Sequence, residues 1–165
     1  MPEGLIVRLP NWLGDTVMAV PAIRALRAAH AGARLTLAGP WAGVLAGQDL
    51  ADVLVAYPRS WTGRLRTADR VRALGAELAV VMPGSLESAL AARYWGAPRR
   101  VGFAGDGRAW LLTHPVTPPE PRLHQVDEYL LLVEALGIEK DGAELAGRAT
   151  IVTTNSNMAV MRRGL

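Results

Sequence analysis

Short apolar runs recur along this 165-residue chain, and each is followed by a turn and then by a segment with helical periodicity. The runs predict strands at 5–9, 34–38, 53–56, 77–81 and 100–103, with a short sixth strand at 110–112. The predicted helices cover 15–30, 42–47, 64–75, 86–95 and 123–136. This alternation predicts an α/β fold, in which a Rossmann-like parallel sheet carries helices on both faces.

Composition removes several classes of function. The chain has no cysteine, which excludes disulfides, thiol nucleophiles and cysteine-based metal sites. Its histidines, His30, His114 and His124, show no metal-ligand spacing, so no metal site is expected. Residues 1–148 carry 16 basic and 15 acidic side chains, a balance that argues against general nucleic-acid binding. The chain also lacks a long apolar segment and a signal peptide, so we expect a cytoplasmic protein.

Four turns follow predicted strands and should lie at one edge of the sheet: 10–15, 39–41, 57–63 and 82–85. Open parallel sheets bind ligands beyond the carboxyl ends of their strands. The sequence therefore predicts that these turns, although far apart in the chain, converge on one ligand-binding edge.

The first of these turns is unsuited to a dinucleotide. It has a single glycine, Gly14, beside the bulky Trp12, whereas the dinucleotide fingerprint needs three glycines around the pyrophosphate. Asp15 follows at the expected start of a helix and allows two interpretations. Aspartate is a preferred helix N-cap, and a carboxylate at this edge also suits proton transfer from a polyhydroxylated ligand.

Residues 59–72 contain five arginines and one acid, Asp69. One interpretation is a solvated helix face, in which Asp69 pairs with neighbouring arginines and Leu65 points to the core. In the other, Arg59 and Arg64, which are nearest the strand end, bind phosphate or carboxylate groups, because guanidinium binds both through paired hydrogen bonds.

The turns after the first and fourth strands supply further candidates. Ser85 is expected to cap the next helix, and a contact with a ligand is the alternative. Gly84 allows a sugar to approach the backbone closely. Next to Asn11 in the first turn, Trp12 is either a partly buried wall or a stacking surface for a sugar ring.

Four motifs, in this order, resemble those of the bacterial ADP-heptose:lipopolysaccharide heptosyltransferases (glycosyltransferase family 9), nearest the heptosyltransferase II branch. They are LGDTVMAVPAIRAL at 13–26, VVMPGSLESALAARYWGAPRRVGF at 80–103, RAWLLTHPV at 108–116 and HQVDEYLLLVEALGI at 124–138. The resemblance covers about residues 4–138.

The resemblance implies the N-terminal domain of a two-domain GT-B enzyme, which binds the lipopolysaccharide inner-core acceptor. It implies an inverting, metal-independent transfer in which Asp15 takes the proton of the acceptor hydroxyl. The donor, ADP-heptose, would be bound by the other domain, and no further cofactor is expected. Acceptor contacts are expected from Asn11, Trp12, Gly14, Arg59, Arg64, Gly84 and Ser85.

We expect residues 1–148 to form this acceptor-side domain and 149–165 to be an atypical tail or linker stub. The His-Pro-Gly turn of the family's nucleotide-sugar domain is absent, so we expect negligible transferase activity from these 165 residues alone. No amphipathic anchor stands out, so contact with the inner membrane is expected only through the acceptor. The surface facing the absent domain is a candidate for self-association. The alternative is a non-catalytic Rossmann-like module that binds an anionic sugar or nucleotide.

Overall fold

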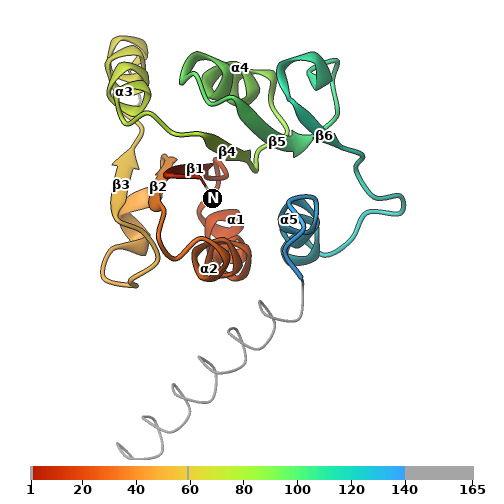
Figure 1. Cartoon of the computed structure of the whole chain (residues 1–165). Helices are drawn as coiled ribbons and strands as arrows, with labels where there is room; N and C mark the ends of the chain where they lie inside the picture. The colour runs from red at the N-terminus through yellow and green to blue at the C-terminus, as the bar shows by residue number, and fades with distance from the viewer. Residues whose placement is uncertain (1, 59, 140–165) are drawn as a thin grey trace, which may run out of the picture.

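Six parallel strands form one sheet in the order β3-β2-β1-β4-β5-β6 (Figure 1). The structure is a computed structural model that describes residues 2–58 and 60–139, so the expected tail lies outside the described residues. The strands are β1 (Gly4–Arg8), β2 (Arg34–Gly39), β3 (Val53–Ala56), β4 (Leu78–Val81), β5 (Arg99–Phe103) and β6 (His114–Val116). The predicted α/β fold with a parallel sheet is confirmed.

Helices cover both faces of the sheet, with α3 and α4 on one side and α1, α2 and α5 on the other (Figure 1). No helix in the described ranges is long and apolar enough to cross a membrane. The α-helices are α1 (Leu13–Met18), α2 (Val20–Ala29), α3 (Trp61–Ala73), α4 (Leu86–Tyr94) and α5 (Gln125–Glu134), and the short 3₁₀ helices are η1 (Ala42–Leu45) and η2 (Ala109–Leu111).

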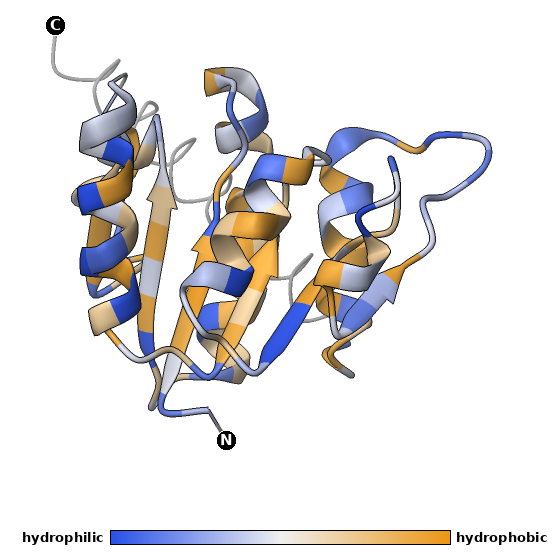
Figure 2. Cartoon of the chain, turned by 90° about the horizontal axis from the view of Figure 1, so that it is seen from above, coloured by the Kyte–Doolittle hydropathy of each residue, from blue (hydrophilic) through white to orange (hydrophobic). Residues whose placement is uncertain are grey.

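Alternation along the strands divides the core into two layers. Leu5 and Val7 of β1 pack with α2 and α5, whereas Ile6 packs with residues of α3 and α4. Successive side chains of a strand point to opposite faces, so a strand buried on both sides reads as a continuous apolar run. Figure 2 shows this as hydrophobic strands beneath helices of mixed character.

The predicted helix at 15–30 is two helices. The break is at Ala19, between α1 and α2, and Pro21 is in the first turn of α2. Proline has no N–H with which to continue the α1 hydrogen-bond ladder, and it is tolerated in the first turn of a new helix. Pro21 therefore coincides with the start of a second helix, and the single helix predicted at 15–30 is wrong in this respect.

The predicted sixth strand at 110–112 is wrong. These residues belong largely to η2, and the sixth strand is β6, which pairs in parallel with β5. Asp106 and Gly107 both have positive φ, and this turn leads the chain into η2 before it can rejoin the sheet. Trp110 is 72% exposed, so the apolar run at 110–112 contains a surface residue.

Burial predicts that truncating Ile23 and truncating Val17 lower the free energy of unfolding by very different amounts. Ile23→Ala should lower the free energy of unfolding by about 2–5 kcal/mol, because Ile23 is fully buried and its loss leaves a cavity. Val17→Ala is the control and should change it by less than about 0.5 kcal/mol, because Val17 is 56% exposed. Urea denaturation of both variants measures the difference, and equal effects would contradict this core.

Candidate functional site

β1 and β4 lie side by side although β2 and β3 separate them in sequence. The chain crosses from β1 toward one edge of the sheet and from β4 toward the other, so their carboxyl ends form the topological switch point where α/β sheets bind ligands. A cleft of about 430 Å³ opens there. The turns after β1, β4 and β5 line it together with the start of α5.

The lining of this cleft is mixed in character. One part is apolar and comes mainly from Pro10, Trp12, Met82, Phe103 and Pro118. The other part carries hydrogen-bonding groups of both charges, from Asn11, Asp15, Ser85, Asp106, Arg108, Arg122, Gln125 and Tyr129. Apolar walls with a few polar groups are typical of small-molecule sites.

Asp15 is in the first turn of α1, and its partly buried side chain lines the cleft. It is not the N-cap that one interpretation predicted, because α1 begins at Leu13 and Trp12 takes the N-cap position. The helix dipole still favours a negative charge in the first turn. Within the described part of the chain Asp15 forms no ion pair, so its charge is available to a ligand.

The end of β2 supports the first turn from the side. The Trp41 Nε1–H donates to the carbonyl oxygen of Asn11 at 3.1 Å. Gly39 lies so close to Leu9 that an added Cβ would be 2.7 Å from the Leu9 Cβ, which is too short for a non-bonded contact. The turn that carries Asp15 is therefore held against β2 as well as against the sheet.

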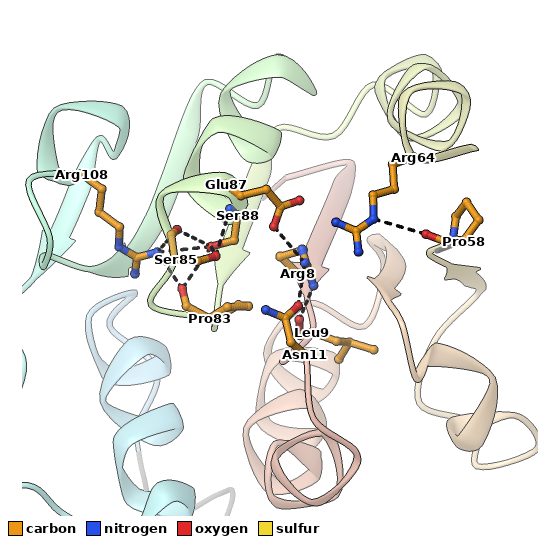
Figure 3. A network of polar contacts seen from close by, with 10 residues as sticks. All are labelled: Arg8, Leu9, Asn11, Pro58, Arg64, Pro83, Ser85, Glu87, Ser88 and Arg108. Atoms are coloured by element: carbon orange, nitrogen blue, oxygen red, sulfur yellow. Dashed lines mark hydrogen bonds and ion pairs between the residues drawn. The ribbon is translucent and has the colours of Figure 1, made fainter. Parts of the chain in front are cut away.

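A buried arginine at the end of β1 fixes the turn that follows this strand. Arg8 ends β1, and its side chain is only 2% exposed. Its Nη1 donates to the carbonyl oxygen of Leu9 at 2.6 Å, and its Nη2 donates to Oδ1 of Asn11 at 2.9 Å (Figure 3). The predicted site residue Asn11 is thus oriented by a side chain that sequence reasoning placed only in a buried strand.

The charge of Arg8 is compensated by groups from two other elements. Its Nη2 is 3.5 Å from Oε2 of Glu87 on α4, and its guanidinium carbon is 4.7 Å from the ring centroid of Tyr57, which follows β3. Burial lowers the pKa of Arg8, and Tyr57 and Glu87 oppose that shift. An arginine remains charged in proteins, so these contacts are required for its burial.

A second buried arginine, Arg108, joins the turns after β4 and β5. Its Nε donates to the carbonyl oxygen of Phe103 at 2.9 Å, while its Nη1 donates to those of Pro83 at 2.6 Å and Ser85 at 2.9 Å (Figure 3). Burial lowers the pKa of Arg108, and the nearby Asp106 opposes the shift. Arg108 thereby fixes the backbone of the cleft on the side opposite Asn11.

Ser85 is the N-cap of α4, as predicted. Its hydroxyl oxygen accepts a hydrogen bond from the backbone N–H of Ser88 at 3.3 Å. The Ser88 hydroxyl donates back to the carbonyl oxygen of Ser85 at 2.7 Å. Gly84 and Ser85 both line the cleft, so capping and contact with a ligand are compatible for Ser85.

The start of α5 adds groups that sequence reasoning did not select. Arg122 donates from Nε and Nη2 to the two carboxylate oxygens of Glu128 at 2.6 and 2.7 Å, and the Leu123 N–H donates to the same carboxylate at 3.2 Å. Tyr129 is buried; burial first, and then the charge of Asp15, raise the pKa of its phenol. The phenol therefore stays protonated beside Asp15. The one available signal was the polar pair Asp127-Glu128 opening an apolar helix.

The structure separates the predicted site residues into two groups. Asn11, Trp12 and Asp15 line the cleft with Gly84 and Ser85, and Gly14 is exposed at the start of α1 between Trp12 and Asp15. Arg64 does not line the cleft. It donates from Nε to the carbonyl oxygen of Pro58 at 3.3 Å and lines a separate groove between α3 and α4 (Figure 3). Arg59 lies outside the described residues.

The described residues contain no cluster of three histidine, cysteine, aspartate or glutamate side chains that could hold a metal ion. His124 is the N-cap of α5, and its Nδ1 accepts a hydrogen bond from the Val126 N–H at 3.3 Å. Glu128, four residues later, is engaged by Arg122. Capping and salt bridging thus account for both residues.

Replacing Arg8 tests its role in holding the turns. Arg8→Lys should lower the free energy of unfolding by about 1–3 kcal/mol. The lysine side chain is shorter, and its single ammonium group cannot reach both the carbonyl oxygen of Leu9 and Oδ1 of Asn11. Arg34→Lys, at the exposed start of β2, is the control and should change it by less than about 0.5 kcal/mol. Urea denaturation of both variants provides the comparison; a stable Arg8→Lys protein would contradict the assignment.

The pair of Arg122 and Glu128 predicts a pH dependence. The hydrogen bonds from Arg122 hold the pKa of Glu128 below its usual value of 4.5. Their stabilisation is complete above that value and is lost as pH falls through the lower folded pKa. The melting temperature of Arg122→Gln should therefore lie below that of the wild type at neutral pH, and the gap should close in acid. Arg99→Gln, an exposed control, should show no such convergence.

Comparisons with known proteins show to which family the chain belongs. Residues 64–160 match the family model of glycosyltransferase family 9 (heptosyltransferase). Lipopolysaccharide heptosyltransferase 2 of Escherichia coli K12 is 30% identical over 151 residues, which cover 86% of this chain and 43% of that protein. The chain thus spans less than half the length of that curated relative.

Solved structures show the same fold. The structure of E. coli ADP-heptose LPS heptosyltransferase II superposes with a TM-score of 0.67 at 26% identity, over 78% of this chain and 39% of that one. A glycosyl transferase family 9 protein from Veillonella parvula superposes with a TM-score of 0.70 at 16% identity, over 83% of this chain and 42% of that one. The chain belongs to glycosyltransferase family 9, the heptosyltransferase family.

Proposed function

We propose that this chain is the acceptor-side domain of a glycosyltransferase that moves heptose from ADP-heptose to the inner core of lipopolysaccharide. The observation that carries the proposal is the place of Asp15. Its carboxylate lines the cleft at the switch point of the sheet and forms no ion pair with the other described residues. Burial lowers the pKa of Arg108, and the charge of Asp106, the other acid of the cleft, opposes that shift.

In this proposal Asp15 is the general base. An acceptor hydroxyl in the cleft attacks the anomeric carbon of the heptose, and the bond from that carbon to the ADP oxygen breaks. ADP leaves with the electron pair, while Asp15 takes the hydroxyl proton. Attack opposite the leaving group inverts the anomeric centre. Holding both substrates in line supplies much of the acceleration, and the base removes the charge that develops on the attacking oxygen.

The rest of the cleft suits a charged oligosaccharide. Trp12 is 75% exposed and offers a flat apolar face to a sugar ring. Asn11, Ser85 and Gln125 provide hydrogen-bonding groups for hydroxyls, and Gly84 leaves the backbone open to close approach. The side chain of Arg122 is 72% exposed and can reach a carboxylate or phosphate of the inner core. The family relatives named for lipopolysaccharide and ADP-heptose support this choice of substrates.

The proposal requires a partner domain and a location. A nucleotide-sugar domain would bring ADP-heptose over the cleft, because the described residues offer no dinucleotide-type glycine turn for the diphosphate. The acceptor is anchored in a lipid, so the protein would act at the cytoplasmic face of the inner membrane. Its partners would then be the lipopolysaccharide acceptor and no nucleic acid.

Asp15→Asn separates catalysis from binding. In a protein that joins this domain to its ADP-heptose-binding domain, the variant should lower kcat for ADP release about 10²–10⁴-fold, because the base is removed. Binding of purified inner-core lipopolysaccharide to the 165-residue chain, followed by tryptophan fluorescence, should stay close to that of the wild type. Asp106→Asn is the matched control and should retain most of kcat.

Two results would contradict the proposal. Transfer by Asp15→Asn at the rate of the wild type would remove Asp15 from the chemistry. Binding of inner-core lipopolysaccharide by the domain, with no transfer even when the donor domain is joined to it, would support the non-catalytic module instead.

A further inference from the structure

A second groove, of about 530 Å³, runs between α3 and α4 on the sheet face opposite α1, α2 and α5. Its walls are two apolar stripes with helical spacing: Trp61, Leu65 and Ala68 on α3, and Leu86, Leu90 and Tyr94 on α4. The function proposed above makes no use of these side chains.

The groove exposes large apolar side chains on a helix that was expected to bury them. One interpretation of residues 59–72 placed Leu65 toward the core, but Leu65 is 61% exposed, and the buried residues of α3 are Thr67 and Val71. Trp61 is 72% exposed, and Leu90 is 47% exposed. Contiguous apolar surface of this kind marks an interaction site.

Positive charge surrounds these apolar stripes. Together α3 and α4 carry five arginines and two acids, whereas the rest of residues 1–148 carries 11 basic and 13 acidic side chains. Arg64 and Arg72 lie over the rings of Trp61 and Tyr94, at 6.0 and 5.2 Å. In Figure 2, hydrophilic and hydrophobic bands alternate along α3 beside the more apolar α4.

Tryptophan and leucine flanked by arginine are the side chains of helices that lie in a membrane interface. The apolar residues enter the boundary between headgroups and acyl chains, and arginines near the surface are attracted to anionic lipids. The local excess of arginines complements such a lipid surface. Among the described residues, Trp61, Leu65 and Leu90 of this groove are left exposed.

We propose that the α3–α4 groove docks this protein on a bilayer surface that contains anionic phospholipid. Trp61, Leu65 and Leu90 enter the headgroup region, while Arg64 and Arg72, which lie over the aromatic rings of the groove, pair with lipid phosphates. This differs from the contact through the acceptor alone that the sequence indicated. It does not rest on the proposed reaction, because it needs neither lipopolysaccharide nor Asp15.

Vesicle co-sedimentation of the 165-residue chain tests the proposal. The wild type should bind vesicles of phosphatidylcholine mixed with phosphatidylglycerol at least about tenfold more tightly than pure phosphatidylcholine, and added salt should weaken this binding. Leu65→Glu/Leu90→Glu and Arg64→Glu/Arg72→Glu should each lower the partition coefficient at least about tenfold. Circular dichroism and melting temperature verify that both variants fold.

Two controls distinguish vesicle binding at the groove from non-specific electrostatic attraction of anionic vesicles to a basic protein. Trp110→Ser removes a tryptophan as exposed as Trp61, but away from the groove, and should leave binding unchanged. Arg34→Glu/Arg99→Glu changes the net charge as much as the α3 pair does and should reduce binding far less.

Three outcomes would overturn the proposal. The first is a wild-type chain that does not sediment with anionic vesicles. The second is equal loss of binding in the Arg34→Glu/Arg99→Glu control and in the Arg64→Glu/Arg72→Glu variant. The third is a dimer, measured by light scattering, that Leu65→Glu/Leu90→Glu converts to a monomer without changing vesicle binding; this result would assign the groove to a second copy of the chain.

Discussion

The charge of Arg8, buried at the end of the central strand, is the constraint around which the candidate site is arranged. Removing a guanidinium from water costs several kcal/mol unless hydrogen bonds and an opposite charge compensate it. The compensating groups come from the first turn, from the residue after β3 and from the start of α4. The contacts that make this burial tolerable therefore also fix the turns on which a ligand-binding edge depends. Arg108 repeats the arrangement on the other side of the cleft, where it binds backbone carbonyl oxygens of two turns.

The cleft lies where the order of the strands reverses, and this position explains its composition. The turns after β1 and β4 are neighbours there, so Asp15 and Ser85 line one site although about 70 residues separate them. The turn after β3 is on the far side of β2 and contributes to the α3–α4 groove instead. Strand order, rather than the spacing of residues along the chain, thus decides that Ser85 lines the cleft and that Arg64 lines the groove.

Much of this could be predicted because the relevant signals are local. Five of the six strands contain short apolar runs that the sequence shows, and Ser85 is recognisable as a helix cap. Asn11, Trp12 and Asp15 could be assigned to a site because parallel strands bring their carboxyl ends to one edge. The roles of Arg8, Arg108 and Tyr129 could not, since each depends on partners distant in sequence. Leu65 was misassigned because helical periodicity identifies an apolar face but does not say what covers it. The sixth strand was misplaced because the apolar run at 110–112 lies largely in η2, which follows a turn with positive φ at Asp106 and Gly107.

The first residues of α4 belong to two surfaces. Ser85 lines the cleft, and the next residue, Leu86, lines the groove. Consecutive Cα atoms are about 3.8 Å apart and cannot separate. A surface bound at the groove is therefore held at a fixed distance from the cleft. If the groove binds a bilayer, the cleft would lie at a fixed height above the lipid headgroups. Whether a sugar of a lipid-anchored oligosaccharide reaches the carboxylate of Asp15 would then depend on the position of that sugar along the oligosaccharide as well as on its identity.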